Sequence, residues 1–243
     1  MASLRKISEE KNICIIAKIH TDFPDKFGIP RQSGLVPQLR GEIVFEPEFR
    51  RPEALIGIEE FSHLWLLWEF SEAKRENWSA TVYPPRLGGK EKRGVFATRS
   101  PFRPNSIGLS CVKLEEVVWE GEDAPKLIVS GVDLLDGTPI FDIKPYLPYA
   151  DAHPEAEGGF GQVHKEDGIA VNFPQELLER LPEEKRQAAL AVLAQDPRAA
   201  YNKQPDYVYG MAFAGYDIRF RVEDQLLTVC DVLHRTDGLE NVK

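Results

Sequence analysis

The side chains best suited to hold an anionic ligand lie together in one segment, GVFATRSPFRPNSIGLS, at positions 94–110. This segment contains two arginines, an asparagine and four hydroxyl groups, and it contains no acidic residue. An arginine guanidinium donates paired hydrogen bonds to a carboxylate or a phosphate, whereas an aspartate or glutamate would repel either group. Because the whole chain has a formal net charge of −9, an acid-free segment indicates a ligand that carries negative charge.

The basic charge of this acidic chain is concentrated around the same segment. Residues 86–103 contain six bases and a single acid, Glu91. A strip of this kind is typical of a surface that binds a polyanion such as RNA, because lysine and arginine displace the counterions of phosphates. A solvated basic loop without a partner explains the same pattern, so charge alone leaves both interpretations open.

Three further polar segments fall at expected strand ends or loops, where binding residues usually lie. They are residues 30–32 (PRQ), residues 62–63 (SH) and residues 134–146 (LLDGTPIFDIKPY). Each also has a purely structural explanation: a turn, a core histidine with satisfied hydrogen bonds, and a hairpin turn at Asp136 and Gly137.

Several common chemistries lack their residues in this chain. There is no GxSxG motif or Walker loop, and the GGFG at 158–161 neither follows an expected strand nor opens a helix. The spacing of the five histidines and the absence of CxxC among three cysteines predict neither a metal site nor a disulfide framework. No apolar run approaches a membrane span, and the N-terminus lacks the apolar core of a signal peptide, so we expect a cytoplasmic protein.

Short β-type runs separated by turn residues make up the first 150 residues, and long helices between them are missing. This pattern favours a mainly β fold with a small closed or nearly closed β-barrel over a Rossmann-type sheet. The apolar run FSHLWLLWEF indicates a strand that is buried on both faces. Strands are expected over residues 13–19, 42–45, 61–70, 81–83, 95–98, 106–114, 117–120, 126–135 and 139–143.

The composition changes over residues 147–168, which are rich in proline, glycine and charge and therefore read as a linker or long loop. Beyond them, two helical patterns followed by three strand patterns predict a small α+β domain built on an antiparallel meander. The helical patterns cover residues 175–181 and 182–195, and the strand patterns cover 206–213, 216–222 and 226–233. The predicted division is a barrel domain over 1–150, a linker over 151–168 and a C-terminal domain over 169–243.

Four segments, taken together, resemble the signature of the TsaA-like family, also called TrmO. They are PPRLGG (84–89), the segment 94–110, LDGTPIFDIKPYLPYA (135–150) and AQDPRAAY (194–201), so the resemblance covers nearly the whole chain. Members of this family are S-adenosylmethionine-dependent methyltransferases that act on N6 of N6-threonylcarbamoyladenosine at tRNA position 37, next to the anticodon. Ser106 stands where the family usually has a second proline, a departure that concerns the stiffness of the loop and removes no functional group.

The resemblance implies a homodimer that binds S-adenosylmethionine on the barrel. An arginine would pair with the methionine carboxylate of the donor, and leucine side chains would cover its adenine. The donor-binding positions carried over by motif are Pro30, Arg31, Gln32, His63, Leu64, Arg99, Leu109, Asp136, Gly137, Thr138 and Pro139.

The same resemblance implies that the basic strip contacts the anticodon stem-loop of tRNA. Asp142 and Tyr146 are the candidate proton acceptors for the N6–H group, which is a weak nucleophile while it is protonated. The positions expected to contact tRNA are Arg86, Lys90, Lys92, Arg93, Arg103 and Asn105.

Two other functions remain compatible with the sequence. The first is a non-enzymatic module that binds an anionic nucleotide with the basic loop as a clamp. The second is a methyltransferase of the same fold that acts on another small molecule or RNA. Binding of S-adenosylmethionine distinguishes the first from an enzyme, and nucleoside analysis of treated tRNA distinguishes the second.

Overall fold

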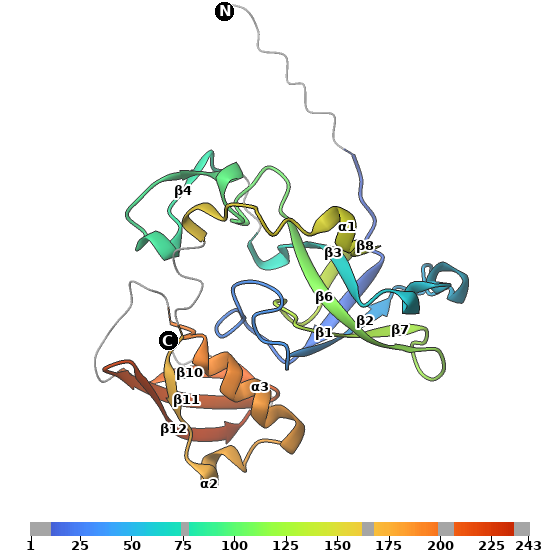
Figure 1. Ribbon diagram of the computed structural model, residues 1–243. Helices are drawn as coiled ribbons and strands as arrows, with labels where there is room; N and C mark the ends of the chain where they lie inside the picture. The colour runs from blue at the N-terminus through green and yellow to red at the C-terminus, as the bar shows by residue number, and fades with distance from the viewer. Residues whose placement is uncertain (1–10, 74–77, 162–167, 199–206, 236–243) are drawn as a thin grey trace, which may run out of the picture.

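The computed structural model describes residues 11–73, 78–161, 168–198 and 207–235 (Figure 1). Its central unit is a closed barrel in which each strand pairs antiparallel with two neighbours, in the order β1–β2–β7–β6–β3–β8 and back to β1. The prediction of a mainly β, closed-barrel fold is therefore confirmed. The barrel strands are β1 (Ala17–Thr21), β2 (Arg40–Phe45), β3 (His63–Glu69), β6 (Ile107–Val118), β7 (Lys126–Ser130) and β8 (Thr138–Pro145).

Strand β3 shows how the barrel is packed. Leu64, Leu66 and Trp68 are buried, whereas Trp65 and Leu67 between them are half-buried. The prediction that this run is buried on both faces is wrong, because one face of every barrel strand points away from the interior. On that outer face the indole of Trp65 donates a 2.9 Å hydrogen bond to the Asp151 carboxylate, which belongs to helix α1 (Pro148–Asp151).

The limits of two other strands also differ from those predicted. The runs 106–114 and 117–120 form one strand, β6, with an irregularity in its pairing between Leu114 and Glu116. Strand β7 ends at Ser130 because Gly131 follows it with a φ of 73°, a backbone conformation that a strand does not adopt.

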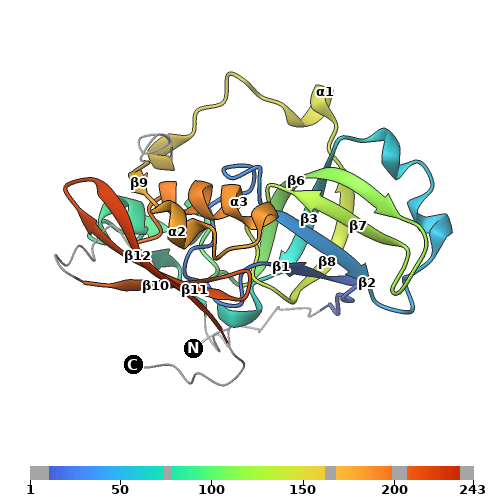
Figure 2. The ribbon, with the colours of Figure 1, turned by 90° about the horizontal axis from the view of Figure 1, so that it is seen from below.

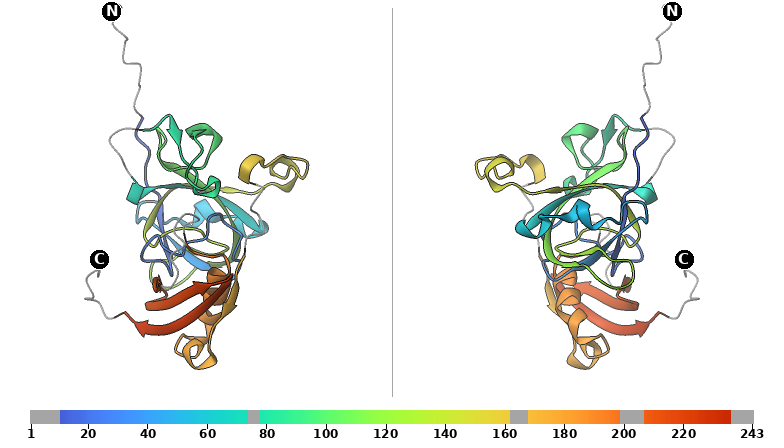
Figure 3. Two further views of the ribbon diagram at one scale, coloured as in Figure 1. Left: turned by 90° about the vertical axis from the view of Figure 1, so that its left-hand side faces the viewer. Right: turned by 90° about the vertical axis from the view of Figure 1, so that its right-hand side faces the viewer.

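Between β3 and β6 the chain leaves the barrel, and we call residues 70–106 the excursion. In both views of Figure 3 its described part lies at the top and the C-terminal sheet lies at the bottom. The predicted strand 95–98 is here a 3-10 turn, because the amide and the hydroxyl of Thr98 both donate to the carbonyl of Val95. The described elements of the excursion are η3 (Ser71–Ala73), β4 (Thr81–Val82), η4 (Pro85–Leu87), β5 (Arg93–Gly94) and η5 (Val95–Ala97).

The C-terminal unit is a four-stranded sheet in the order β10–β11–β12–β9, with helices against one face (Figure 2). Strands β10 to β12 form the predicted antiparallel meander, and β9 adds to β12 in parallel. The elements are β9 (Ala170–Asn172), α2 (Gln175–Leu178), α3 (Glu183–Ala194), β10 (Tyr209–Phe213), β11 (Tyr216–Glu223) and β12 (Leu226–His234). The remaining short turns are η1 (Pro52–Leu55), η2 (Ile58–Glu60) and η6 (Gly159–Gly161).

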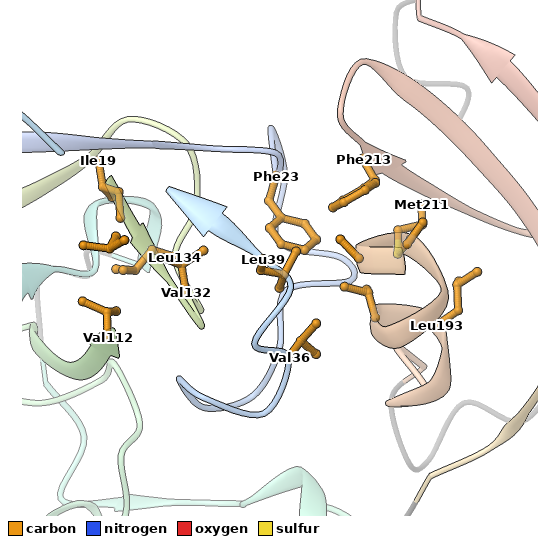
Figure 4. Close-up of a cluster of buried hydrophobic side chains, with 14 of the residues drawn as sticks. Ile19, Phe23, Val36, Leu39, Val112, Val132, Leu134, Leu193, Met211 and Phe213 are labelled. Atoms are coloured by element: carbon orange, nitrogen blue, oxygen red, sulfur yellow. The ribbon is translucent and has the colours of Figure 1, made fainter. Parts of the chain in front are cut away.

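The loop between β1 and β2, residues 22–39, joins the barrel to the C-terminal unit. Phe23 is fully buried between the two, with its ring 5.4 Å from that of Phe213 (Figure 4). Polar contacts reinforce the junction, since Lys185 pairs with the Asp22 carboxylate at 2.7 Å. The buried residues of both units form one continuous hydrophobic cluster, so the loop is part of a shared core.

Candidate functional site

A pocket of about 630 Å³ lies at the end of the barrel where the loop 22–39 meets the excursion. Its volume falls in the range of roughly 300–1,000 Å³ that is usual for small-molecule sites. Its apolar wall comes from the end of β3, the start of β6 and the loop. The main apolar side chains that line it are Ile29, Trp68, Phe70, Phe102, Ile107 and Leu109.

Six of the predicted donor-binding residues line this pocket. Arg99 comes from the excursion and Gln32 from the loop, and the guanidinium of Arg99 donates a hydrogen bond to the side-chain oxygen of Gln32. This contact joins two segments that are far apart in the sequence into one polar wall. The six residues are Pro30, Arg31, Gln32, Arg99, Leu109 and Thr138.

The predicted segment 136–139 forms the turn that leads into β8, beside the pocket. Its backbone is fixed by the loop and by β1, since the Asp136 amide donates to the carbonyl of Phe23 and the Gly137 amide donates to that of Ile19. The Asp136 carboxylate accepts a hydrogen bond from the Thr21 amide at 3.0 Å. Of the predicted residues 136–139, Thr138 lines the pocket, while Asp136, Gly137 and Pro139 do not.

The structure does not bring His63 and Leu64 to this pocket. Leu64 is fully buried in the barrel core, and His63 begins β3 at the strand end remote from Trp68, which lines the pocket. Five residues of extended strand separate His63 from Trp68 by about 17 Å. His63 instead lies beside Tyr146, with 6.1 Å between their ring centres. The predicted donor set is therefore divided between two ends of the barrel.

Asp133 is a pocket residue that sequence reasoning missed. Its carboxylate accepts a 2.6 Å hydrogen bond from the Ser110 hydroxyl, which in turn accepts one from the Trp68 indole. Burial raises the pKa of Asp133 from 3.8 to about 6, against the opposing effects of the Ser110 and Ser33 hydrogen bonds and the Arg99 charge. The sequence signal for Asp133 is an acidic residue within the apolar run SGVDLL, because a carboxylate that is buried needs hydrogen-bond donors around it.

Neither candidate proton acceptor lines the pocket. Asp142 pairs with Lys144 at 2.8 Å and borders a separate hollow formed by residues such as Phe45 and Ile58. Tyr146 lies at the His63 end of the barrel, where its ring centre is 5.8 Å from that of Trp65.

The predicted tRNA-binding residues lie on the excursion, with different surroundings. Lys90, Lys92 and Asn105 are exposed, whereas Arg103 is partly buried and donates a 2.8 Å hydrogen bond to the carbonyl of Thr98. The charge of Arg93 is paired with Glu91 at 2.8 Å, which reduces its value for binding phosphate. Arg86 lies in η4.

Among the described residues, no group of three or more histidine, cysteine, aspartate or glutamate side chains is arranged to hold a metal ion. In the same part of the chain, no helix has both the length and the apolar character that crossing a membrane requires.

Two family descriptions match the chain. Residues 18–152 match the family described as tRNA-methyltransferase O N-terminal domain, and residues 166–235 match the TrmO C-terminal domain. The first match alone covers more than half of the chain, and it contains the excursion and all of the barrel strands except the first residue of β1.

Curated relatives and solved structures agree with these matches. The tRNA (adenine(37)-N6)-methyltransferase of Escherichia coli is 43% identical over 217 residues, which are 86% of this chain and 92% of the relative. A protein of Pseudomonas aeruginosa named "Putative S-adenosylmethionine-dependent methyltransferase RcsF" is 42% identical over 226 residues, 89% of this chain and 95% of its own. A crystal structure of TrmO from Pseudomonas aeruginosa superimposes with a TM-score of 0.75 at 37% identity, covering 95% of this chain and 100% of that one.

Proposed function

Because this chain belongs to the TrmO family, we propose that it transfers a methyl group from S-adenosylmethionine to tRNA. The acceptor is N6 of the N6-threonylcarbamoyladenosine at position 37, next to the anticodon. The observation that carries the proposal is the pocket on which Pro30, Arg31, Gln32, Arg99, Leu109 and Thr138 converge.

The pocket suits the chemical groups of S-adenosylmethionine. Its volume of about 630 Å³ is sufficient for a ligand of this size, and its wall is mostly apolar. Leu109, which is 47% exposed, offers an aliphatic face to the adenine. Arg31 and Arg99 offer guanidinium groups to the methionine carboxylate.

The contribution of the protein to the reaction is mainly alignment. When bound, S-adenosylmethionine supplies a methyl carbon whose bond to sulfur breaks as its bond to N6 forms, leaving a neutral thioether while the N6 proton passes to a base or water. The Arg99–Gln32 contact holds the excursion and the loop 22–39 in a fixed relation, and the apolar side chains limit access of water.

We also propose that two copies of the chain complete the donor site. His63 lies about 17 Å along β3 from the pocket, so its predicted contact with the donor requires the barrel end of a second copy. Sedimentation should show a dimer at micromolar concentration, and a fully active monomer would contradict this assembly. A cytoplasmic location is part of the proposal, because tRNA is the acceptor.

The test of the function is mass analysis of nucleosides from tRNA that carries N6-threonylcarbamoyladenosine. Incubation with the protein and S-adenosylmethionine should convert this nucleoside to its N6-methyl form. Donor binding without any methylated product would favour the non-enzymatic nucleotide-binding module. A methylated product at another nucleoside or on a small molecule would favour a methyltransferase of the same fold with a different substrate.

A further inference from the structure

A second pocket, of about 1230 Å³, adjoins the donor pocket. The two hollows meet at Arg99 and Gln32, whose side chains are hydrogen-bonded to each other. Methyl transfer requires donor and acceptor atoms to approach within roughly 3–3.5 Å, so two pockets with a common wall have the arrangement that two substrates need. The residues that line both pockets are Arg31, Gln32, Thr98, Arg99, Pro101 and Phe102.

Aromatic rings on the excursion are exposed around this second pocket. Phe96 is 72% exposed and Tyr83 is 53% exposed, and both line it. Trp78 lies nearly parallel to Phe96, with 6.2 Å between ring centres. Phe160 closes the pocket from the segment that follows α1. An exposed ring offers a face on which a nucleobase can stack. Such a ring therefore contributes more to the affinity for a nucleic acid than to the stability of the free protein.

Cations accompany these rings. The ammonium of Lys92 lies 5.8 Å from the ring centre of Tyr83, and the guanidinium of Arg103 lies 5.9 Å from that of Phe96. None of the described side chains that line the pocket is a carboxylate. Proteins hold single-stranded nucleic acid by combining aromatic rings, which stack on bases, with cations, which pair with phosphates. Binding of a second copy of this acidic chain, or of an apolar peptide, does not require this combination.

We propose that this second pocket receives the unstacked nucleoside that is to be methylated and stacks its base on Phe96. The inference rests on the proposed function and adds the site of the acceptor to it. The base enters from the anticodon loop, where nucleotides are already free of a duplex, and its N6 group faces the wall at Arg99. Lys92 and Arg103 then lie close to the phosphates on either side of the extruded nucleoside.

The experiment compares two synthetic anticodon stem-loops, one with N6-threonylcarbamoyladenosine and one with an abasic site at the same position. Phe96→Ala should weaken binding of the intact loop by about 5- to 150-fold, the effect of losing one stacked base. The same variant should bind the abasic loop as wild type does, and Phe96→Trp should restore binding of the intact loop. Because Phe96 is 72% exposed, its removal should leave the fold intact.

The control is Trp119→Ala, which removes another exposed aromatic ring. Trp119 follows the last residue of β6, whereas the donor pocket lies at the start of that strand, and Trp119 lines neither pocket. Calorimetry should show unchanged affinity of Phe96→Ala for S-adenosylmethionine, since Phe96 does not line the donor pocket. Equal binding of the intact loop by wild type and Phe96→Ala would overturn the inference. So would a shift of Phe96→Ala from dimer to monomer, because the ring would then belong to a subunit interface.

Failure of the function itself gives a different result. If wild type converts no nucleoside in tRNA, the proposed function fails and this inference fails with it. If wild type methylates tRNA while Phe96→Ala has wild-type affinity and turnover, only the inference about the second pocket is overturned.

Discussion

Asp133 carries a titratable carboxyl group in largely apolar surroundings. Its carboxylate lies in the pocket wall, bonded to Ser110 and near the Arg99 charge. The pKa of about 6 means that the folded protein keeps a proton on this group over a range where the unfolded chain, at 3.8, has lost it. The Asp133 carboxyl group therefore stabilises the folded protein at low pH, and this contribution to the free energy of unfolding is lost as the pH rises from about 4 to about 6.

Asp133→Asn removes this titration and should abolish that fall. The free energy of unfolding of the variant, relative to wild type, should rise by about 2 kcal/mol between pH 4 and pH 7, because part of the effect of a shift of roughly two units falls below pH 4. Denaturant unfolding at a series of pH values measures it. Ser110→Ala removes a hydrogen bond to the carboxylate and should enlarge the fall. A difference that is constant across this pH range would show that the carboxyl titrates normally.

Arg99 belongs to the wall that both pockets share, and its guanidinium should bind the donor carboxylate. A hydrogen bond to a charged group is worth about 1.5–3 kcal/mol, so Arg99→Ala should weaken S-adenosylmethionine binding by roughly 10- to 150-fold. Calorimetry measures the change. Arg219→Ala, an exposed arginine paired with Asp217 in the C-terminal sheet, is the matched control and should bind the donor normally. Wild-type donor affinity in Arg99→Ala would remove Arg99 from the site.

The excursion is the element that we expect to contact the RNA. If Lys90 and Lys92 bind phosphates, the double variant Lys90→Ala, Lys92→Ala should lower the slope of log affinity against log salt concentration by about 1.4, at roughly 0.7 per contact. Filter binding of tRNA at several salt concentrations measures the slope. Lys18→Ala and Lys144→Ala together remove the same charge from barrel strands. An unchanged slope in the excursion variant would identify a solvated basic loop.

Secondary-structure elements can be predicted from the sequence where one physical constraint is sufficient to define them. The meander β10–β12 follows from alternation, because Ile218, Phe220 and Val222 all face one core. The sequence predicts a strand at residues 95–98 because these residues are of β type. The 3-10 turn at Val95–Ala97 is instead stabilised by hydrogen bonds from Thr98 to the Val95 carbonyl, and these bonds are seen only once the turn has formed. The division of the chain at residues 150 and 168 stays a prediction, since the two units share one core.

The candidate site was predicted in part, for a related reason. Motifs identify residues such as Arg99 and Gln32, but they do not give distances, so the separation of His63 from the pocket was invisible. Asp133 was missed because a lone acid in an apolar run is informative only when its donor, Ser110, is seen across the barrel. The second pocket depends on rings from two distant segments, Tyr83 and Phe160, which no local pattern connects.

Across the whole molecule, Phe23 tests whether barrel and C-terminal unit fold together. Its ring is fully buried against Phe213, so Phe23→Ala should lower the free energy of unfolding by about 3–5 kcal/mol. Thermal unfolding followed by circular dichroism should show one transition, moved to lower temperature. Phe96→Ala is the matched control, since the same atoms are removed from an exposed ring. Two separate transitions in the Phe23→Ala protein would show that the units unfold independently.

The loop 22–39 places Phe23 in the shared core and, a few residues later, Arg31 and Gln32 in the wall of the pocket that we propose for the donor. Gly28 between them has a φ of 100°, and a Cβ there would lie 2.5 Å from the sulfur of Met211, so this backbone is pressed against β10. A ligand that immobilises Arg31 must also restrain the sheet behind it, and coupling of this kind is reciprocal. Amide hydrogens of β10 and β11 should therefore exchange with deuterium more slowly once S-adenosylmethionine is bound, although neither strand contributes a residue to the pocket.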